Sequence, residues 1–147
     1  MIIRNATMDD MPELLVMGEC AHVEAGYNAI APFCSESMKR LAKKAIELGV
    51  TLVAEEDCLK GVLGMVVAPY PTNNEYMAAY EALFWIHPDN RGNNLGRELV
   101  TRVEDQCKDL GINSIHHSHM AVGSESAQRL YESTGNIKSE ICYTKVV

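Results

Sequence analysis

The stretch Arg91-Gly92-Asn93-Asn94-Leu95-Gly96 decides how this chain is interpreted. It follows an apolar run, Ala82 to Ile86, which predicts a central strand. It precedes a segment in which apolar side chains recur every three or four residues up to Gly111, which predicts a long helix. A loop between a strand and a helix presents free backbone amides and the positive end of the helix dipole, and both favour an anion. Such a loop can therefore hold a pyrophosphate.

Two common phosphate-binding patterns do not fit this loop. It has no Gly-Lys-Ser/Thr ending, and its glycines lack the G-x-G-x-x-G spacing of dinucleotide-binding folds. A nucleoside triphosphatase and a dehydrogenase are therefore both disfavoured.

The rest of the chain adds further strands and helices on both sides of the loop. The pattern predicts a strand at 1–6, a helix after Thr7, a loop at 26–33, a helix from Ser35 to Gly49, antiparallel strands at 50–55 and 61–68, a strand at 112–120, a helix from about Ser124 to Ser133, and a closing strand at 137–147. We therefore expect one α/β or α+β domain over residues 1–147, with a mostly antiparallel sheet.

Composition limits the partners. A formal net charge of −7 disfavours nucleic acid and anionic membranes. The chain shows no secretory signal and no apolar stretch of the ~20 residues that a membrane span needs, so we expect a cytoplasmic protein. The five cysteines form no C-x-x-C pair, and we expect free thiols.

Three histidines leave several interpretations open. On a strand, His117 and His119 would share a face. No third metal ligand is identifiable beside His116, His117 and His119, so we expect no metal site. Three interpretations of these histidines remain open: a base or substrate contact in a cleft, a zinc or nickel site, and an ordinary polar strand face.

Two motifs together resemble a known family. The arrangement strand-Pro-x-x-Arg-Gly-x-x-Leu-Gly-helix is similar to the coenzyme A loop of the GNAT acetyltransferases, with Arg91 and Gly96 matching and Asn94 in place of the first patterned glycine. Asn is the residue that best tolerates a left-handed backbone after glycine. About thirty residues on, 126–135 resembles the family's Ala-x-x-Leu-Tyr-x-x-x-Gly stretch, with Ser124 in place of the usual Asn. The opening 3–7 with Asp10 also resembles the family's first strand and helix start.

This resemblance implies a fold and an activity. The fold would be a mixed, mostly antiparallel twisted sheet flanked by helices, with two neighbouring parallel strands splayed apart. Acetyl-coenzyme A would be the co-substrate, held by the strand Leu83 to His87 and by the loop. The residues implied as its binding site are Phe84, Trp85, Ile86, Arg91, Gly92, Asn93, Asn94, Leu95, Gly96 and Ser124.

The resemblance also implies catalytic residues. Tyr131 matches the family's general acid, and Glu81 lies where some members keep a carboxylate base. The expected reaction is N-acetylation of a primary amine on a small molecule or a protein. An inactive GNAT-like module that binds coenzyme A or a partner is the alternative, and a homodimer is a further possibility.

Overall fold

A twisted mixed sheet forms the centre of the computed structural model, which describes residues 1–120 and 125–147. In this part of the chain the strand order is β1-β2-β3-β4-β5. The strands are β1 (Ile2–Asn5), β2 (Gly49–Glu55), β3 (Leu59–Tyr70), β4 (Asn73–Ile86) and β5 (Ser114–His116). The first four pair antiparallel, and β5 pairs parallel to β4.

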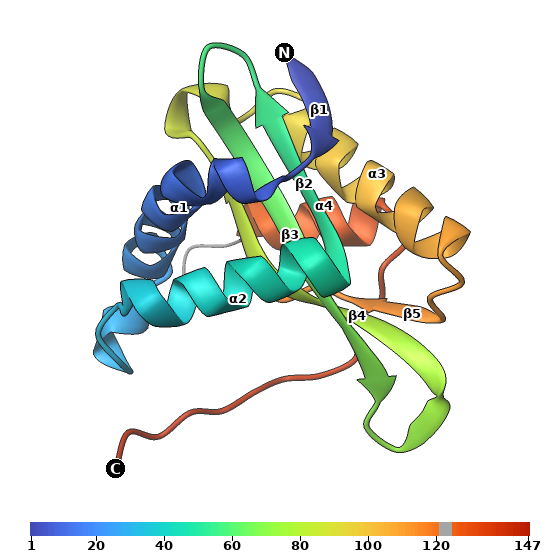
Figure 1. The fold of residues 1–147 in the computed structure, drawn as a ribbon. Coiled ribbons are helices and arrows are strands. Elements are labelled where there is room, and N and C mark those ends of the chain that lie inside the picture. Colours follow the sequence, from blue (N-terminus) through green and yellow to red (C-terminus); the bar gives the residue numbers. More distant parts are fainter. Residues whose placement is uncertain (121–124) are drawn as a thin grey trace.

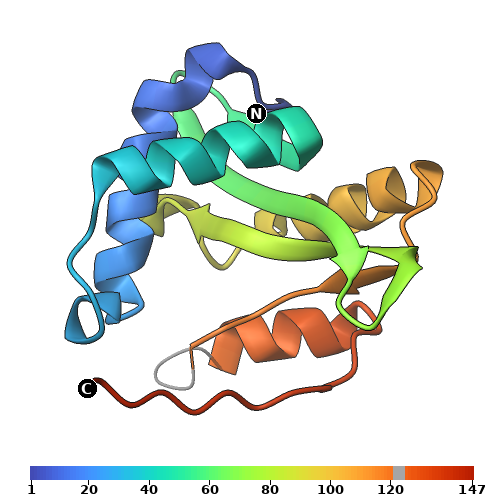
Figure 2. The same ribbon diagram turned by 60° about the horizontal axis from the view of Figure 1, so that its bottom comes forward.

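Four α-helices cover the two faces of this sheet within the described residues. They are α1 (Met11–Glu24), α2 (Ser35–Leu48), α3 (Leu95–Asp109) and α4 (Glu125–Ser133). Helices α1 and α2 lie on one face, and α3 and α4 lie on the other (Figures 1 and 2). Short 3-10 turns at Met8–Asp10, Tyr27–Ala29 and Pro88–Asn90 complete the described elements. The mixed, mostly antiparallel fold expected from the sequence is confirmed.

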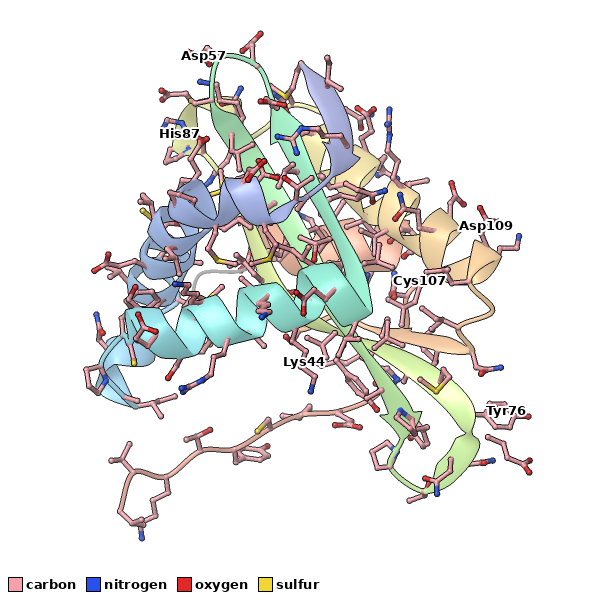
Figure 3. All side chains as sticks on the ribbon, in the orientation of Figure 1. Lys44, Asp57, Tyr76, His87, Cys107 and Asp109 are labelled. Carbon is pink, nitrogen blue, oxygen red and sulfur yellow. The ribbon has the colours of Figure 1, made fainter. Side chains whose placement is uncertain are left out.

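Each face of the sheet buries its own apolar cluster. Under α3 the spacing of Leu95, Leu99, Val103 and Cys107 brings one helical stripe onto the sheet, and all four side chains are buried. The labelled Cys107 lies on this helix (Figure 3). Under α1, Leu14 and Met17 pack against β2 and β3 in a second cluster. These two clusters fix the helices on either side of β4, the strand that carries the candidate site.

A β-bulge interrupts the pairing of β4 with β3. Gly64 pairs with Leu83 and Met65 pairs with Glu81, so Ala82 is an extra residue on β4. Such a bulge bends its strand and increases the local twist, and bulges are common next to active sites. Ala82 lies two residues after Tyr80, the last residue of β4 that pairs with β5.

Strands β4 and β5 stay together for only three residue pairs. Ala78 to Tyr80 pair with Ser114 to His116, and beyond these pairs the two chains diverge (Figure 2). The strand predicted at 112–120 is therefore much shorter in the structure. The divergence leaves one edge of β4, from Glu81 to Ile86, without a strand partner among the described residues.

The closing strand expected at 137–147 is wrong. This segment has no assigned secondary structure and runs along the outside of the molecule (Figure 1). Ile137, Ile141 and Tyr143 are 86%, 66% and 90% exposed. Alternation of apolar residues suits a strand only when the strand meets an edge with which it can pair, and the segment pairs with no strand in the described part of the chain.

Candidate active site

A cavity of about 700 Å³ lies between the diverging chains of β4 and β5. Its wall is formed by the second half of β4, the loop after that strand, the first turn of α3, the end of α1, residues 118–120 and the inner face of α4. His87 marks the end of β4 at which this loop begins, and Tyr76 projects from the strand's other end (Figure 3). The bulge at Ala82 also lines the cavity. Strand divergence and bulge thus open the sheet at one place.

The loop before α3 leaves backbone amides free at the rim of the cavity. Gly92 has a φ of +78°, a left-handed conformation that favours glycine. The side-chain oxygen of Asn93 accepts the amide of Leu95 at 3.0 Å. The next two amides, of Gly96 and Arg97, donate to no acceptor among the described residues. The helix dipole adds partial positive charge at the same place, so this rim favours an anion.

Asn94 does not need a left-handed backbone. Its φ is −79° and its ψ is 1°, a conformation open to most residues. The expectation that Asn stands here because it tolerates positive φ is therefore wrong. The position requires no glycine for conformational reasons, and Asn94 is exposed in the loop.

Gly96 allows α3 to approach β4 and α4 closely. A β-carbon at this position would lie 3.3 Å from side-chain carbons of both Ile86 and Leu130. The absence of a side chain therefore keeps the first turn of α3 close to the strand edge and α4.

Arg91 is bound within the site rather than free. Its guanidinium donates to Glu24 at 2.7 Å and to the Ile86 carbonyl at 2.7 Å, and it lies 5.7 Å from the ring centroid of Trp85. The Trp85 indole also donates to Glu24, at 3.1 Å. Glu24, at the end of α1, thus fixes the loop and the end of β4 together. No local pattern marks Glu24, because its contacts with Trp85 and Arg91 join positions 61 and 67 residues apart.

Tyr131 and Glu81 meet at the inner end of the cavity. The Tyr131 hydroxyl donates to Glu81 Oε2 at 2.7 Å, and the same oxygen lies 2.9 Å from His117 Nδ1. The His117 ring stacks on the Tyr131 ring with centroids 4.5 Å apart and an interplanar angle of 15°. The structure therefore joins the two catalytic residues that the resemblance implied. It adds His117, for which the sequence leaves several interpretations open.

Burial, and then the neighbouring Glu81 carboxylate, raise the pKa of Tyr131 well above its usual range. A raised pKa keeps the phenol protonated at neutral pH. The Tyr131 phenol therefore carries a proton beside the Glu81 carboxylate, at the edge of a cavity large enough for a substrate. Holding a proton at neutral pH beside the cavity is one requirement of a general acid.

The other implied binding residues lie on two sides of β4. Phe84 and Ile86 pack towards α3 and α4, and Trp85 packs towards α1. The strand edge that they share borders the cavity. Ser124 lies outside the described residues.

Among the described residues, His116 and the cysteines form no second candidate site. His116 faces the opposite way from His117, stacked on Tyr80 at 4.8 Å and in contact with Ser114. In the described residues no group of three or more His, Cys, Asp or Glu is placed to hold a metal ion. The five cysteines are free, and burial raises the pKa of the Cys107 thiol to about 11. No helix within 1–120 and 125–147 is both long and apolar enough to span a bilayer.

Solved acetyltransferases share this fold. A predicted acetyltransferase from Clostridium acetobutylicum, solved with acetyl-CoA, aligns with a TM-score of 0.79 at 19% identity, covering 98% of this chain and 94% of that one. A ribosomal-protein-alanine N-acetyltransferase from Brucella melitensis biovar Abortus aligns at 0.73 and 17%, covering 100% of both chains. An aminoglycoside acetyltransferase from an uncultured soil metagenomic sample, in complex with sisomicin, aligns at 0.74 and 15%, covering 99% and 95%.

Sequence comparison identifies the family more directly. No curated protein matches the chain significantly. The family model described as the acetyltransferase (GNAT) family matches residues 22–135, which include the loop before α3, the Glu81–Tyr131 pair and His117. Because this match covers most of the chain, the protein belongs to the GNAT family of acetyltransferases.

Proposed function

We propose that the protein transfers an acetyl group from acetyl-coenzyme A to a primary amine. The observation that carries this proposal is the cavity between the diverging chains of β4 and β5. Its rim carries amides that have no acceptor among the described residues, and the Tyr131–Glu81 pair lies at its inner end. One end suits the phosphates of a long donor, and the other offers a proton and a carboxylate. The family membership supports the same reaction class.

Acetyl-coenzyme A fits the order of groups along the cavity. Its pyrophosphate would bind the amides of the loop and of the first turn of α3, including Gly96 and Arg97. Its pantetheine arm would follow the unpaired edge of β4, where Phe84 to Ile86 lie, and would use the edge's free backbone groups. The thioester would then reach the inner end beside Tyr131. A backbone amide directed at the thioester carbonyl would stabilise the charge that develops on its oxygen.

The reaction requires the amine nitrogen to lose a proton and the coenzyme A sulfur to gain one. The amine nitrogen attacks the carbonyl carbon, the new N–C bond forms and the C–S bond breaks. The nitrogen loses a proton, for which Glu81 is the acceptor, and the coenzyme A sulfur gains one, for which Tyr131 is the donor. Because Tyr131 already contacts Glu81, the proton taken from the amine can restore the phenol.

Chemistry and the structural neighbours support an amine as the acceptor. A carboxylate base beside a thioester suits a nucleophile that must lose a proton, as an amine does. Two structural neighbours are described as a ribosomal-protein-alanine N-acetyltransferase and an aminoglycoside acetyltransferase. Both descriptions are consistent with a nitrogen acceptor for this chain.

The loop before α3 allows a test of acetyl-coenzyme A binding. Asn94→Asp adds one negative charge where the pyrophosphate would bind, without changing side-chain size or backbone requirements, and its side chain makes no hydrogen bond among the described residues. We expect the Kd for acetyl-coenzyme A to rise about 10-fold, or ~1.4 kcal/mol, in isothermal titration calorimetry.

Asn74→Asp is the matched control for this variant. It makes the same charge change on an exposed residue at the far end of β4. Its Kd should stay close to that of the wild type, because most of the added field is screened over that distance. Equal affinities for Asn94→Asp and Asn74→Asp would exclude the loop as the pyrophosphate site. Absence of measurable binding by the wild-type protein would overturn the proposed function.

A further inference from the structure

His117 is buried behind the Tyr131–Glu81 pair. Its side chain is 2% exposed and that of Glu81 is 8% exposed. It follows β5, at the point where the chain has begun to diverge from β4. Burial of a histidine has an energetic cost unless its polar atoms have partners. The contacts of this ring therefore indicate its role.

One oxygen of Glu81 connects the three side chains. Oε2 accepts the Tyr131 hydroxyl at 2.7 Å and lies 2.9 Å from His117 Nδ1. An ionised carboxylate can only accept, so with Glu81 ionised this contact is a hydrogen bond only when Nδ1 carries the proton. The two donors together hold Oε2 in place, and Glu81 keeps its other oxygen for a further contact.

The ring of His117 also positions Tyr131. The two rings are nearly parallel, at 15°, with centroids 4.5 Å apart. Stacking of this kind restrains the phenol ring, and a displacement of about 1 Å at a reacting group can lower a rate ~10²-fold. His117 therefore contacts both members of the pair, Glu81 by a hydrogen bond and Tyr131 by its ring face.

Other charged groups face the ring from neighbouring elements. Glu104 of α3 has Oε1 3.9 Å from His117 Nε2, and this nitrogen has no hydrogen-bond partner among the described residues. Glu104 is itself held by Asn136, at 3.0 Å. The ring is thus enclosed by Glu81 of β4, Glu104 of α3 and Tyr131 of α4, without access to bulk water.

We infer that His117 is a positioning residue for proton transfer, which holds Glu81 Oε2 through Nδ1–H and Tyr131 through ring stacking. The inference rests on the proposed acetyl transfer. In the reaction Glu81 takes the amine proton, Tyr131 gives its proton to sulfur, and the proton on Glu81 returns to Tyr131. His117 keeps its own Nδ1 proton throughout and maintains the short Glu81–Tyr131 distance that this return requires.

Two substitutions separate this role from simple packing. His117→Asn keeps a donor branching from the same position as Nδ1 and loses the stacked ring volume. His117→Phe keeps the ring and loses the donor. We expect kcat to fall about 10-fold in His117→Asn and ~10²-fold in His117→Phe, with the KM for acetyl-coenzyme A unchanged in both.

A packing role predicts the opposite order. Phe fills the space better than Asn, so a purely structural His117 would leave His117→Phe the more active and the more heat-stable variant. That order of kcat would overturn the inference. His116→Asn and His116→Phe serve as controls, because His116 contacts Tyr80 and Ser114 on the other side of the chain, and kcat should not change.

A measurement without turnover tests the hydrogen bond itself. Nitrogen-15 NMR of the histidine side chains should show His117 Nδ1 protonated, and this signal should shift in Glu81→Gln. An unprotonated Nδ1 would overturn the inference even if the enzyme is active. If the wild type acetylates no amine, the proposed function is refuted. The proposed role of His117 in proton transfer is then refuted as well, whichever tautomer is found.

Discussion

Tyr131→Phe should lower kcat by ~10²-fold or more while acetyl-coenzyme A binds with unchanged affinity. The substitution removes only the hydroxyl, and loss of a general acid commonly costs this much. The ring remains on the core side of α4, so the fold should persist, although Glu81 Oε2 keeps only His117 as a donor. Steady-state kinetics with chemistry shown to be rate-limiting, together with calorimetry, would measure both quantities.

The pKa of Tyr131 adds a test of the pH profile. Because burial and Glu81 raise this pKa, the phenol should keep its proton beyond the usual tyrosine value near 10. Wild-type kcat should therefore show no loss from this residue as the pH rises towards about 10. A decline there that disappears in Tyr131→Phe would mean that the phenol ionises in the usual range.

Tyr80→Phe provides the matched control. It removes the same atom from a tyrosine whose hydroxyl is buried without a hydrogen-bond partner among the described residues. Its loss should leave kcat unchanged and stability equal or slightly higher, since no hydrogen bond is broken. Should Tyr131→Phe keep wild-type kcat, Tyr131 is a packing residue and the acid is another group or water.

Glu81→Gln should lower kcat/KM by ~10²-fold at neutral pH. An amide of nearly the same size replaces the carboxylate, so the cavity keeps its shape while the site loses its base. At neutral pH most primary amines carry a proton, and an α-amino group has an ordinary pKa of about 8. The defect should therefore shrink as the pH approaches the pKa of the acceptor, because the amine then arrives already neutral.

The control for this variant lies on the same strand. Glu75→Gln removes an exposed carboxylate near the far end of β4, and its activity should match the wild type at every pH. A defect in Glu81→Gln that stays constant from neutral to alkaline pH would show that the carboxylate serves structure or orientation instead of deprotonation.

Local patterns were sufficient for most of the fold. Helix α3 was predictable because Leu95, Leu99, Val103 and Cys107 bring their side chains onto one face, and their burial confirms it. For the segment 137–147 a local pattern is insufficient. Its alternation indicates that a strand is feasible, but pairing depends on an edge elsewhere in the fold, which a local pattern does not contain.

The site was predictable where a motif carried it. The resemblance named Glu81 and Tyr131, 50 residues apart, and the structure brings them to 2.7 Å, while their catalytic roles stay predictions. It did not indicate that Arg91 is held by Glu24, because that contact depends on how the end of α1 meets β4. His117 could be suspected as a polar residue on a strand, but its face is set by the divergence of the chain after His116.

We propose that this cavity transfers acetyl groups to amines. The most direct measurement incubates the protein with acetyl-coenzyme A and a panel of amines, including polyamines, aminoglycosides and peptides with free amino termini, and follows release of the coenzyme A thiol. We predict amine-dependent thiol release with at least one class, matched by mass spectrometry of the acetylated product and slowed ~10²-fold or more in Tyr131→Phe. Binding of acetyl-coenzyme A without thiol release above the amine-free control, for every class, would contradict the claim and identify an inactive binding module.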